Sequence, residues 1–115
     1  MIVNLLEVLK DYEGKECSEQ IEEKVDQEGQ SILRVSRIPL TFKSVFKQAI
    51  NKNLPTEERT VEDLVMSDGL NVKIYSNDEI EITASDAEFL LDRVVKIWNS
   101  PTIYKCVRDL FRPSN

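Results

Sequence analysis

Histidine is missing from this 115-residue sequence, which also contains only three glycines, two cysteines and one tryptophan. Without histidine, the chain cannot build a Ser-His-Asp or Cys-His nucleophile, and it lacks the side chain that most often binds transition metals. The three glycines form neither a GxxxxGK nor a GxGxxG pattern, so a nucleotide-binding phosphate loop is not expected. The missing histidine and phosphate-loop motifs predict a protein that is not an enzyme and that has no cofactor.

Cysteines and long apolar segments are also scarce in this sequence. Cys17 and Cys106 are far apart in the sequence and show no CxxC spacing, so structural zinc is not expected. The first residues lack a basic leader, and no segment approaches the roughly 18 apolar residues of a membrane-spanning helix. We therefore expect a cytoplasmic protein with two reduced thiols, and a disulfide between them is the alternative.

The composition is otherwise that of an ordinary globular domain. Apolar residues make up 41% of the chain and charged residues 31%, which is enough apolar surface for one modest core. We predict a single domain over residues 1–115. Its expected class is α+β, mostly helical, with about four helices and a small N-terminal β element.

Three helices are predicted from apolar residues that recur every three or four positions. The first begins after Thr41, which is placed as an N-cap, and the second after a capping box of Ser85 and Glu88. The third begins at Pro101, because proline is tolerated in the first turn of a helix. The apolar stripes comprise Phe42, Val45, Phe46, Ala49 and Ile50; Ala87, Leu90, Leu91, Val94, Val95 and Trp98; and Ile103, Cys106, Val107, Leu110 and Phe111. We expect these faces, including Cys106, to close into one core.

The middle of the chain permits two interpretations. A helix that starts after Thr56 or Thr60 could continue through Gly69, at a cost of about 1 kcal/mol relative to alanine. Alternatively, it could end at Gly69, and residues 70–83 would then form a hairpin of two strands. We favour the long helix.

The N-terminal third is predicted to hold the β structure. Ile2–Val8 and Ser31–Ile38 are rich in β-branched residues, and the two segments are candidates for pairing with each other. Asp11–Gln30 lies between them and contains few apolar residues. This composition indicates a loop with at most one short helical turn.

Charge is unevenly distributed along the chain, whose net charge is -6. Nine acidic residues lie between Glu7 and Glu28, whereas none lies between Gly29 and Thr56. The basic residues of this second window are Arg34, Arg37, Lys43, Lys47 and Lys52. They either neutralise two solvated acidic surfaces or form a docking patch for a charged protein. The acidic total argues against direct binding of DNA or RNA.

Carboxylates are the only candidates for acid–base chemistry or for binding Mg²⁺. The candidate pairs are Glu79 with Glu81 and Asp86 with Glu88. The first pair adjoins a turn, where solvated acids are common, and the second pair is explained by the capping box. We therefore predict no catalytic residue and no metal site.

The order of several segments resembles that of small uncharacterised proteins encoded by tailed bacteriophages and prophages. The matching segments are the glycine-containing turn 11–15, the helix start 40–45, Leu70 with Lys73, Ile74 and Tyr75, and the acidic cap 79–86. The chain departs from that pattern in a long insertion over residues 17–29 and in Gly69. The resemblance implies an origin rather than an activity, because those proteins have no catalytic residues to carry over.

These observations predict a non-catalytic protein that binds another protein. If the resemblance holds, the partner is a host factor or a component of virion assembly, and the protein acts in the host cytoplasm. The alternatives are a bacterial immunity protein or antitoxin and an acidic nucleic-acid mimic that inhibits a basic enzyme. We expect a monomer or a small oligomer that does not bind membranes.

Arg34, Arg37, Lys43 and Lys47 are the candidate partner-binding residues. We predict that reversing their charge weakens capture of the partner without lowering the melting temperature, because a docking patch is exposed to solvent. Affinity capture and thermal denaturation of the same variant measure the two effects. Unchanged capture would exclude the patch.

Overall fold

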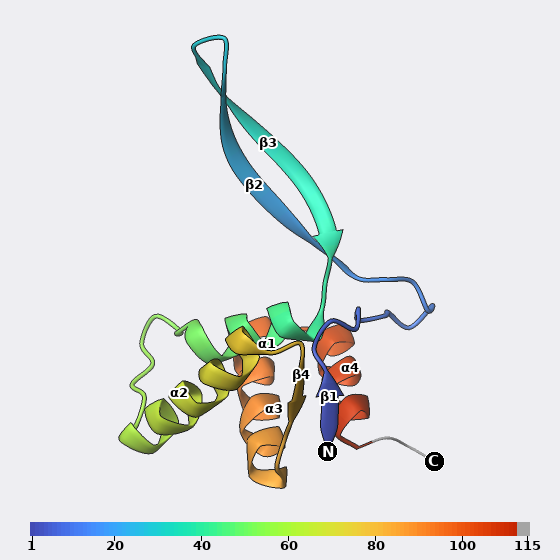
Figure 1. The fold of residues 1–115 in the computed structure, drawn as a ribbon, viewed down its shortest axis with the longest axis vertical. Coiled ribbons are helices and arrows are strands. Elements are labelled where there is room, and N and C mark those ends of the chain that lie inside the picture. Colours follow the sequence, from blue (N-terminus) through green and yellow to red (C-terminus); the bar gives the residue numbers. More distant parts are fainter. Residues whose placement is uncertain (113–115) are drawn as a thin grey trace.

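A computed structural model describes residues 1–112 and places eight elements of secondary structure. The chain combines a helical body with a long two-stranded arm that stands away from it (Figure 1). The elements are β1 (Ile2–Asn4), β2 (Ser18–Gln27), β3 (Gln30–Pro39), α1 (Phe42–Asn51), α2 (Val61–Ser76), β4 (Glu79–Glu81), α3 (Ala84–Trp98) and α4 (Pro101–Phe111). The predicted α+β class with four helices is confirmed.

Helix α1 lies at the centre of the body and packs against α2 and α3, and α3 in turn packs against α4. Its N-cap is Thr41, whose hydroxyl accepts a hydrogen bond from the backbone N–H of Ser44, as predicted. All five apolar residues of its predicted stripe are buried. The aromatic ring of Phe46 stacks on that of Phe111, which joins α1 to the C-terminal end of α4. The core therefore forms around α1.

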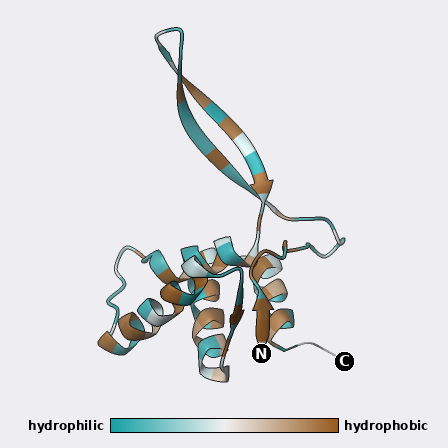
Figure 2. Ribbon diagram, in the orientation of Figure 1, coloured by the Kyte–Doolittle hydropathy of each residue, from teal (hydrophilic) through white to brown (hydrophobic). Residues whose placement is uncertain are grey.

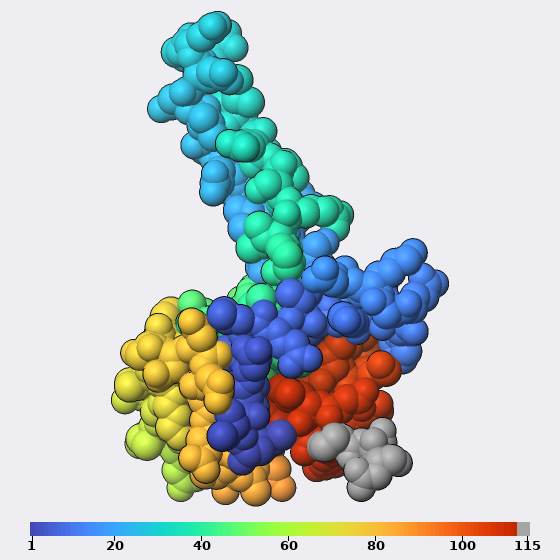
Figure 3. Space-filling model, turned by 45° about the vertical axis from the view of Figure 1, so that its right-hand side comes forward, coloured from blue at the N-terminus to red at the C-terminus, as the bar shows by residue number. Residues whose placement is uncertain are grey.

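The N-terminal strand does not pair as predicted. β1 forms an antiparallel sheet with β4, with Val3 opposite Ile80, and both of these side chains are buried. The predicted pairing of Ile2–Val8 with Ser31–Ile38 is therefore wrong. Because β4 immediately precedes α3, this small sheet brings the N-terminus of the chain to the middle of the helical body, as Figure 3 also shows.

The helix boundaries decide between the two interpretations that the sequence left open for the middle of the chain. Helix α2 begins after the N-cap Thr60 and continues through Gly69 to Ser76, so the long helix is confirmed and the 70–83 hairpin is wrong. Helix α3 has its capping box at Thr83 and Asp86 instead of Ser85 and Glu88, so that prediction is displaced by two residues. Helix α4 begins at Pro101, as predicted.

The apolar stripes of α3 and α4 are buried less evenly than predicted. Leu90, Val94, Ile103 and Val107 belong to the core, whereas Cys106 is only half-buried. Val95 is 48% exposed. Trp98 is also half-buried, and its indole N–H donates a hydrogen bond to the carbonyl of Val45 at 3.1 Å. Trp98 therefore lies at the boundary of the core, in agreement with its position on the helix.

The arm is the largest departure from the predicted fold. Strands β2 and β3 contain ten residues each and pair antiparallel along their whole length, so the predicted loop over Asp11–Gln30 is wrong. Glu28 and Gly29 join the strands with φ angles of 53° and 76°. Two successive residues in the left-handed region define a type I′ turn, whose twist matches that of the strands it connects.

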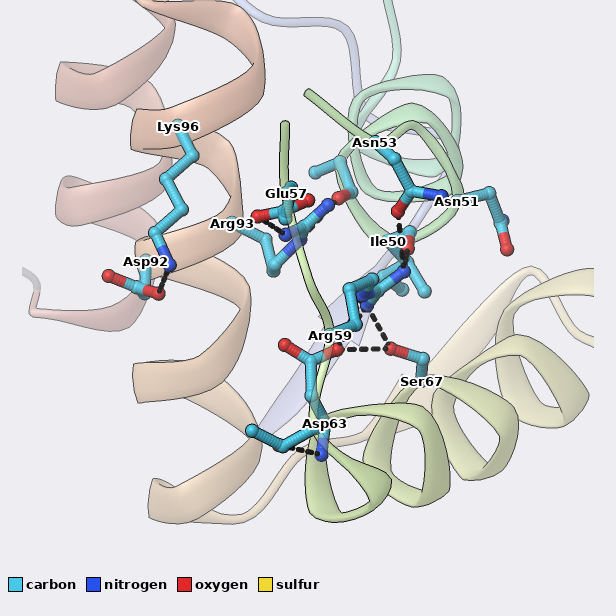
Figure 4. Close-up of polar contacts among 12 residues, drawn as sticks. Ile50, Asn51, Asn53, Glu57, Arg59, Asp63, Ser67, Asp92, Arg93 and Lys96 are labelled. Atoms are coloured by element: carbon cyan, nitrogen blue, oxygen red, sulfur yellow. Dashed lines mark hydrogen bonds and ion pairs between the residues drawn. The ribbon is translucent and has the colours of Figure 1, made fainter. Parts of the chain in front are cut away.

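Two arginines hold the C-terminal end of α1 (Figure 4). Arg93 on α3 is fully buried and donates to the carbonyls of Ala49 and Lys52, at 2.9 and 2.6 Å. Arg59 donates to the carbonyl of Ile50 at 2.6 Å. The last carbonyls of a helix have no partners within the helix and carry partial negative charge, so guanidinium groups stabilise this end.

Each of these arginines is paired with a carboxylate. Arg93 binds Glu57 at 2.7 Å, and Arg59 binds Asp63, the third residue of α2. A buried guanidinium without such a partner would be strongly destabilising. The two ion pairs therefore tie α1 to α3, to α2 and to the loop between α1 and α2.

Replacing Glu57 should show how the Arg93–Glu57 ion pair contributes to the pH dependence of the free energy of unfolding. The hydrogen bond from Arg93 lowers the pKa of Glu57. A carboxyl group whose pKa is lowered by folding stabilises the folded state above its unfolded pKa of about 4.3, and this contribution disappears as the pH falls through the folded pKa. The Glu57→Gln variant should be less stable than the parent at neutral pH, and the difference should shrink below pH 4.

Urea denaturation followed by the fluorescence of Trp98 measures this effect. The matched control is Glu58→Gln, which removes an exposed carboxylate next in the chain and should change the free energy of unfolding by less than about 0.5 kcal/mol. Parallel pH profiles for the parent and the Glu57→Gln variant would contradict the proposed role of the pair.

Candidate protein-binding arm

The arm is fixed to the body only at its base. The backbone N–H of Leu40 donates to the carbonyl of Cys17, and the N–H of Cys17 donates to that of Leu9, at 2.9 and 2.8 Å. The carboxylate of Glu19 accepts hydrogen bonds from Ser44 at 2.6 Å and from Gln48 at 3.0 Å. Within residues 1–112, the hydrogen bonds recorded for residues 20–37 remain within the arm. The base is therefore anchored, and the rest projects freely.

One face of the arm carries four aliphatic side chains, whereas the other face carries two, Leu33 and Val35, which are 55% and 52% exposed. Directly opposite residues of paired strands share a face, and residues alternate between faces along each strand. This register places Ile21, Val25, Ile32 and Ile38 together, and we call these four residues the apolar face. Val25, Ile32 and Ile38 are 37–45% exposed, because the two-stranded ribbon has no second layer to cover them (Figure 2).

The two edges of the arm differ in charge. The β2 edge carries Glu19, Glu22, Glu23, Lys24 and Asp26. By contrast, β3 contains no acidic residue and only two basic ones, Arg34 and Arg37. Arg34 lies directly opposite Glu23, so its charge is locally compensated on the apolar face. The acidic and basic windows of the sequence thus become the two strands of one ribbon.

A second apolar surface lies on the outer side of α2. Its residues, which we call the α2 stripe, are Val61, Leu64, Val65, Val72 and Tyr75, and they are 51–76% exposed. The inner side of the same helix buries Leu70 and Ile74 in the core. Helix α2 is therefore apolar on two opposite sides, and only one of them is packed against the body.

The four basic residues proposed as a docking patch do not share one face. Arg34 and Arg37 lie on opposite faces of β3, because three positions separate them. Lys43 donates to the carbonyl of Asn77 and to the carboxylate of Asp78, both at 3.1 Å. The ammonium group of Lys47 lies 4.3 Å from the centre of the Tyr75 ring. Charge reversal at the two lysines would therefore remove contacts within the body, so the prediction of an unchanged melting temperature does not hold for them.

The candidate carboxylates also lie apart from one another. Glu79 and Glu81 are exposed on β4, and Glu88 is exposed on α3. Asp86 accepts the backbone N–H of Thr83 in the capping box and lies 3.8 Å from Lys73. Among residues 1–112, no group of three or more Cys, Asp or Glu side chains is placed to hold a metal ion. Over the same residues, no helix has both the length and the apolar composition needed to cross a bilayer.

The two thiols are free and lie near the base of the arm. The Cys106 thiol contacts the carbonyl of Lys10 at 3.1 Å, and Lys10 forms a β-bridge with Glu16, next to Cys17. Burial raises the pKa of both thiols, and the nearby Cys106 thiol and Asp11 carboxylate raise that of Cys17 further. Neither thiol is activated as a nucleophile.

Comparisons of the chain with protein-family models, curated proteins and solved structures found no match. The resemblance to phage proteins therefore stays a prediction.

Sequence reasoning missed both the arm and the buried arginine. One signal for the arm was present, the pair Glu28-Gly29 centred between two ten-residue segments. A glycine preceded by a residue that tolerates the left-handed region is typical of two-residue hairpin turns, although glutamate is less typical there than asparagine or aspartate. Arg93 gave no comparable signal, because its charge suggests a solvent-facing position.

The raised pKa of the thiols predicts slow alkylation. At neutral pH, the thiolate fraction of Cys17 and Cys106 should be below that of an unfolded cysteine, so both should react more slowly with iodoacetamide. Mass spectrometry of the intact protein, before and after addition of urea, measures the two rates. Equal rates in the folded and unfolded chain would show that neither thiol is protected.

Proposed function

We propose that this protein is a non-catalytic interaction protein that binds another protein through its arm. The single observation that carries the proposal is the exposure of the apolar face on a ribbon that projects from the body. An isolated two-stranded hairpin is marginally stable in water. Covering its apolar face with a partner removes this deficit, so binding and ordering of the arm support each other.

The apolar face is large enough to contribute useful affinity. Completing the burial of a side chain that is about 40% exposed stabilises a complex by roughly 1 kcal/mol. Val25, Ile32 and Ile38 are all exposed to about this extent. Together they would supply roughly 3 kcal/mol, which is more than a hundredfold in the dissociation constant.

The charge of the arm favours a protein over a nucleic acid as the partner. Residues 18–39 contain five acidic and three basic side chains, and the whole chain carries a net charge of -6. Binding to DNA or RNA depends on Lys and Arg contacts with the phosphates, which this balance disfavours. Whether the partner comes from a host or from a virion stays a prediction that depends on the resemblance.

Shortening the arm tests the proposal. Glu19 and Ile38 are directly opposite, so residues 20–37 can be replaced by Asn-Gly, which closes a two-residue turn in the same register. Affinity capture from the native cell should recover the partner with the full chain and lose it with the shortened chain. Recovery of the same proteins at the same level by both baits would contradict the proposal.

Point variants then separate the apolar face from the α2 stripe. Ile32→Thr with Ile38→Thr removes apolar area but keeps β-branched side chains that favour strands. This double variant should weaken binding of the purified partner at least about tenfold. The matched control, Val61→Thr with Val72→Thr, makes the same kind of change on α2 and should leave the affinity unchanged. Isothermal titration calorimetry measures both affinities.

A further inference from the structure

The outer edge of β3 has free backbone groups along most of its length. In a hairpin closed by a two-residue turn, the two residues that flank the turn exchange both hydrogen bonds, and bonded pairs then alternate along the strands. Gln27 and Gln30 flank the turn, so the even-numbered residues of β3 bond to β2. The backbone N–H groups of Ser31, Leu33, Val35 and Arg37 therefore point away from β2.

These outward groups have no partner within the chain. Among residues 1–112, no backbone hydrogen bond is recorded between residues 31–37 and any segment other than β2. The arm stands clear of the helical body on both sides, as Figures 1 and 3 show. A further strand therefore has access to this edge without displacing any element of the body.

The compositions of the two strands distinguish an outer edge from an inner one. Proteins protect exposed sheet edges with charged side chains, and β2 carries such charges at five of its ten positions. β3 has only two charges and carries Ile32, Leu33, Val35 and Ile38. Its composition is typical of a strand with neighbours on both sides. Only Pro39, at its end, blocks continuation of the pairing.

We propose that a second copy of this chain pairs with the free edge of β3, antiparallel and across a twofold axis. The two arms then form a four-stranded sheet in the order β2, β3, β3 of the second copy and β2 of the second copy. Both charged strands lie at the outside of this sheet, and both apolar strands lie at its centre. A self-complementary edge of this kind is what a twofold interface requires.

The arrangement of the arginines disfavours one of the neighbouring registers. When Val35 lies opposite Val35 of the other copy, Ile32 lies opposite Ile38, Leu33 opposite Arg37, and Arg34 opposite Ser36. No arginine then lies directly opposite another arginine. Like charges that lie directly opposite each other destabilise paired strands. Shifting the strands by two residues in one direction places Arg34 opposite Arg34. Placing the two Arg34 side chains directly opposite each other disfavours that shifted register.

This pairing goes beyond the proposed function, because it uses the edge of the arm and not its apolar face. Antiparallel arms of about 33 Å place the two helical bodies at opposite ends of the sheet. The apolar faces of both copies lie on the same side of that sheet. The dimer therefore presents a continuous surface of twice the size to the partner.

Two proline variants test the edge directly. Val35 and Glu22 are opposite residues of one pair, and their N–H groups point to opposite edges of the arm. Proline is tolerated where the N–H of a strand faces solvent, but it removes the donor that a new strand needs. Sedimentation equilibrium, from micromolar to millimolar concentration, should show a dimer for the parent and for Glu22→Pro. It should show a monomer for Val35→Pro.

Several outcomes would overturn the proposal. A parent chain that stays monomeric at the highest concentration excludes pairing, whereas loss of partner capture on shortening the arm would still support the proposed function. Dimers of equal strength for both proline variants place the contact elsewhere, for example on the α2 stripe. If both variants are monomeric, disulfide cross-linking tests the pairing. Under diamide, the Val35→Cys chain should form a disulfide-linked dimer, and the Glu22→Cys chain should not. The absence of the Val35→Cys dimer refutes the pairing.

Discussion

The C-terminal end of α1 depends on two guanidinium groups that enter from different parts of the chain. Helix α1 has no basic residue in its own last turn, so Arg93 and Arg59 supply the positive charge that its last carbonyls attract. Each guanidinium is in turn neutralised by a carboxylate, Glu57 or Asp63. These ion pairs set the positions of α2 and α3 relative to α1. At the other end of the same helix, Thr41 caps the first turn and connects directly to the arm.

This arrangement makes α1 the support for a projecting ribbon. Helix α1 holds the base of the arm through Ser44 and Gln48, while its apolar stripe forms the centre of the core. The core of the body is therefore closed by its own contacts, although the α2 stripe stays exposed on its surface, whereas the arm has no core. A two-stranded ribbon has no interior. Its apolar side chains can therefore be covered, and the backbone groups of its free edge hydrogen-bonded, only by another molecule. The proposed function and the proposed dimer are two consequences of this single constraint, one for the face and one for the edge.

The sequence predicts those parts of the fold that depend on local periodicity. The stripe of α1, the cap at Thr41, the start of α4 at Pro101 and the passage of α2 through Gly69 follow from spacing and capping preferences within one segment, and Thr60 is one of the two caps predicted for α2. Strand β1 pairs with β4 although nearly 80 residues separate them in the sequence. Each strand has only three residues, which is too short for a sequence pattern that would predict this pairing. The sequence predicts a loop in place of the charged strand β2, because alternation of apolar and polar residues is weak when both faces of a strand meet solvent. Arg93 was missed because the sequence does not show that α1 ends nearby. Of the four predicted docking residues, Arg34 and Arg37 lie on the arm, whereas Lys43 and Lys47 make contacts within the body.

The most direct test of the central claim is amide hydrogen exchange of the chain, measured by mass spectrometry with and without its captured protein partner. If the arm is the binding element, exchange should slow across residues 18–39 and stay nearly unchanged over the outer side of α2. Protection confined to α2, or to α3 and α4, with exchange of the arm unaltered, would contradict the account.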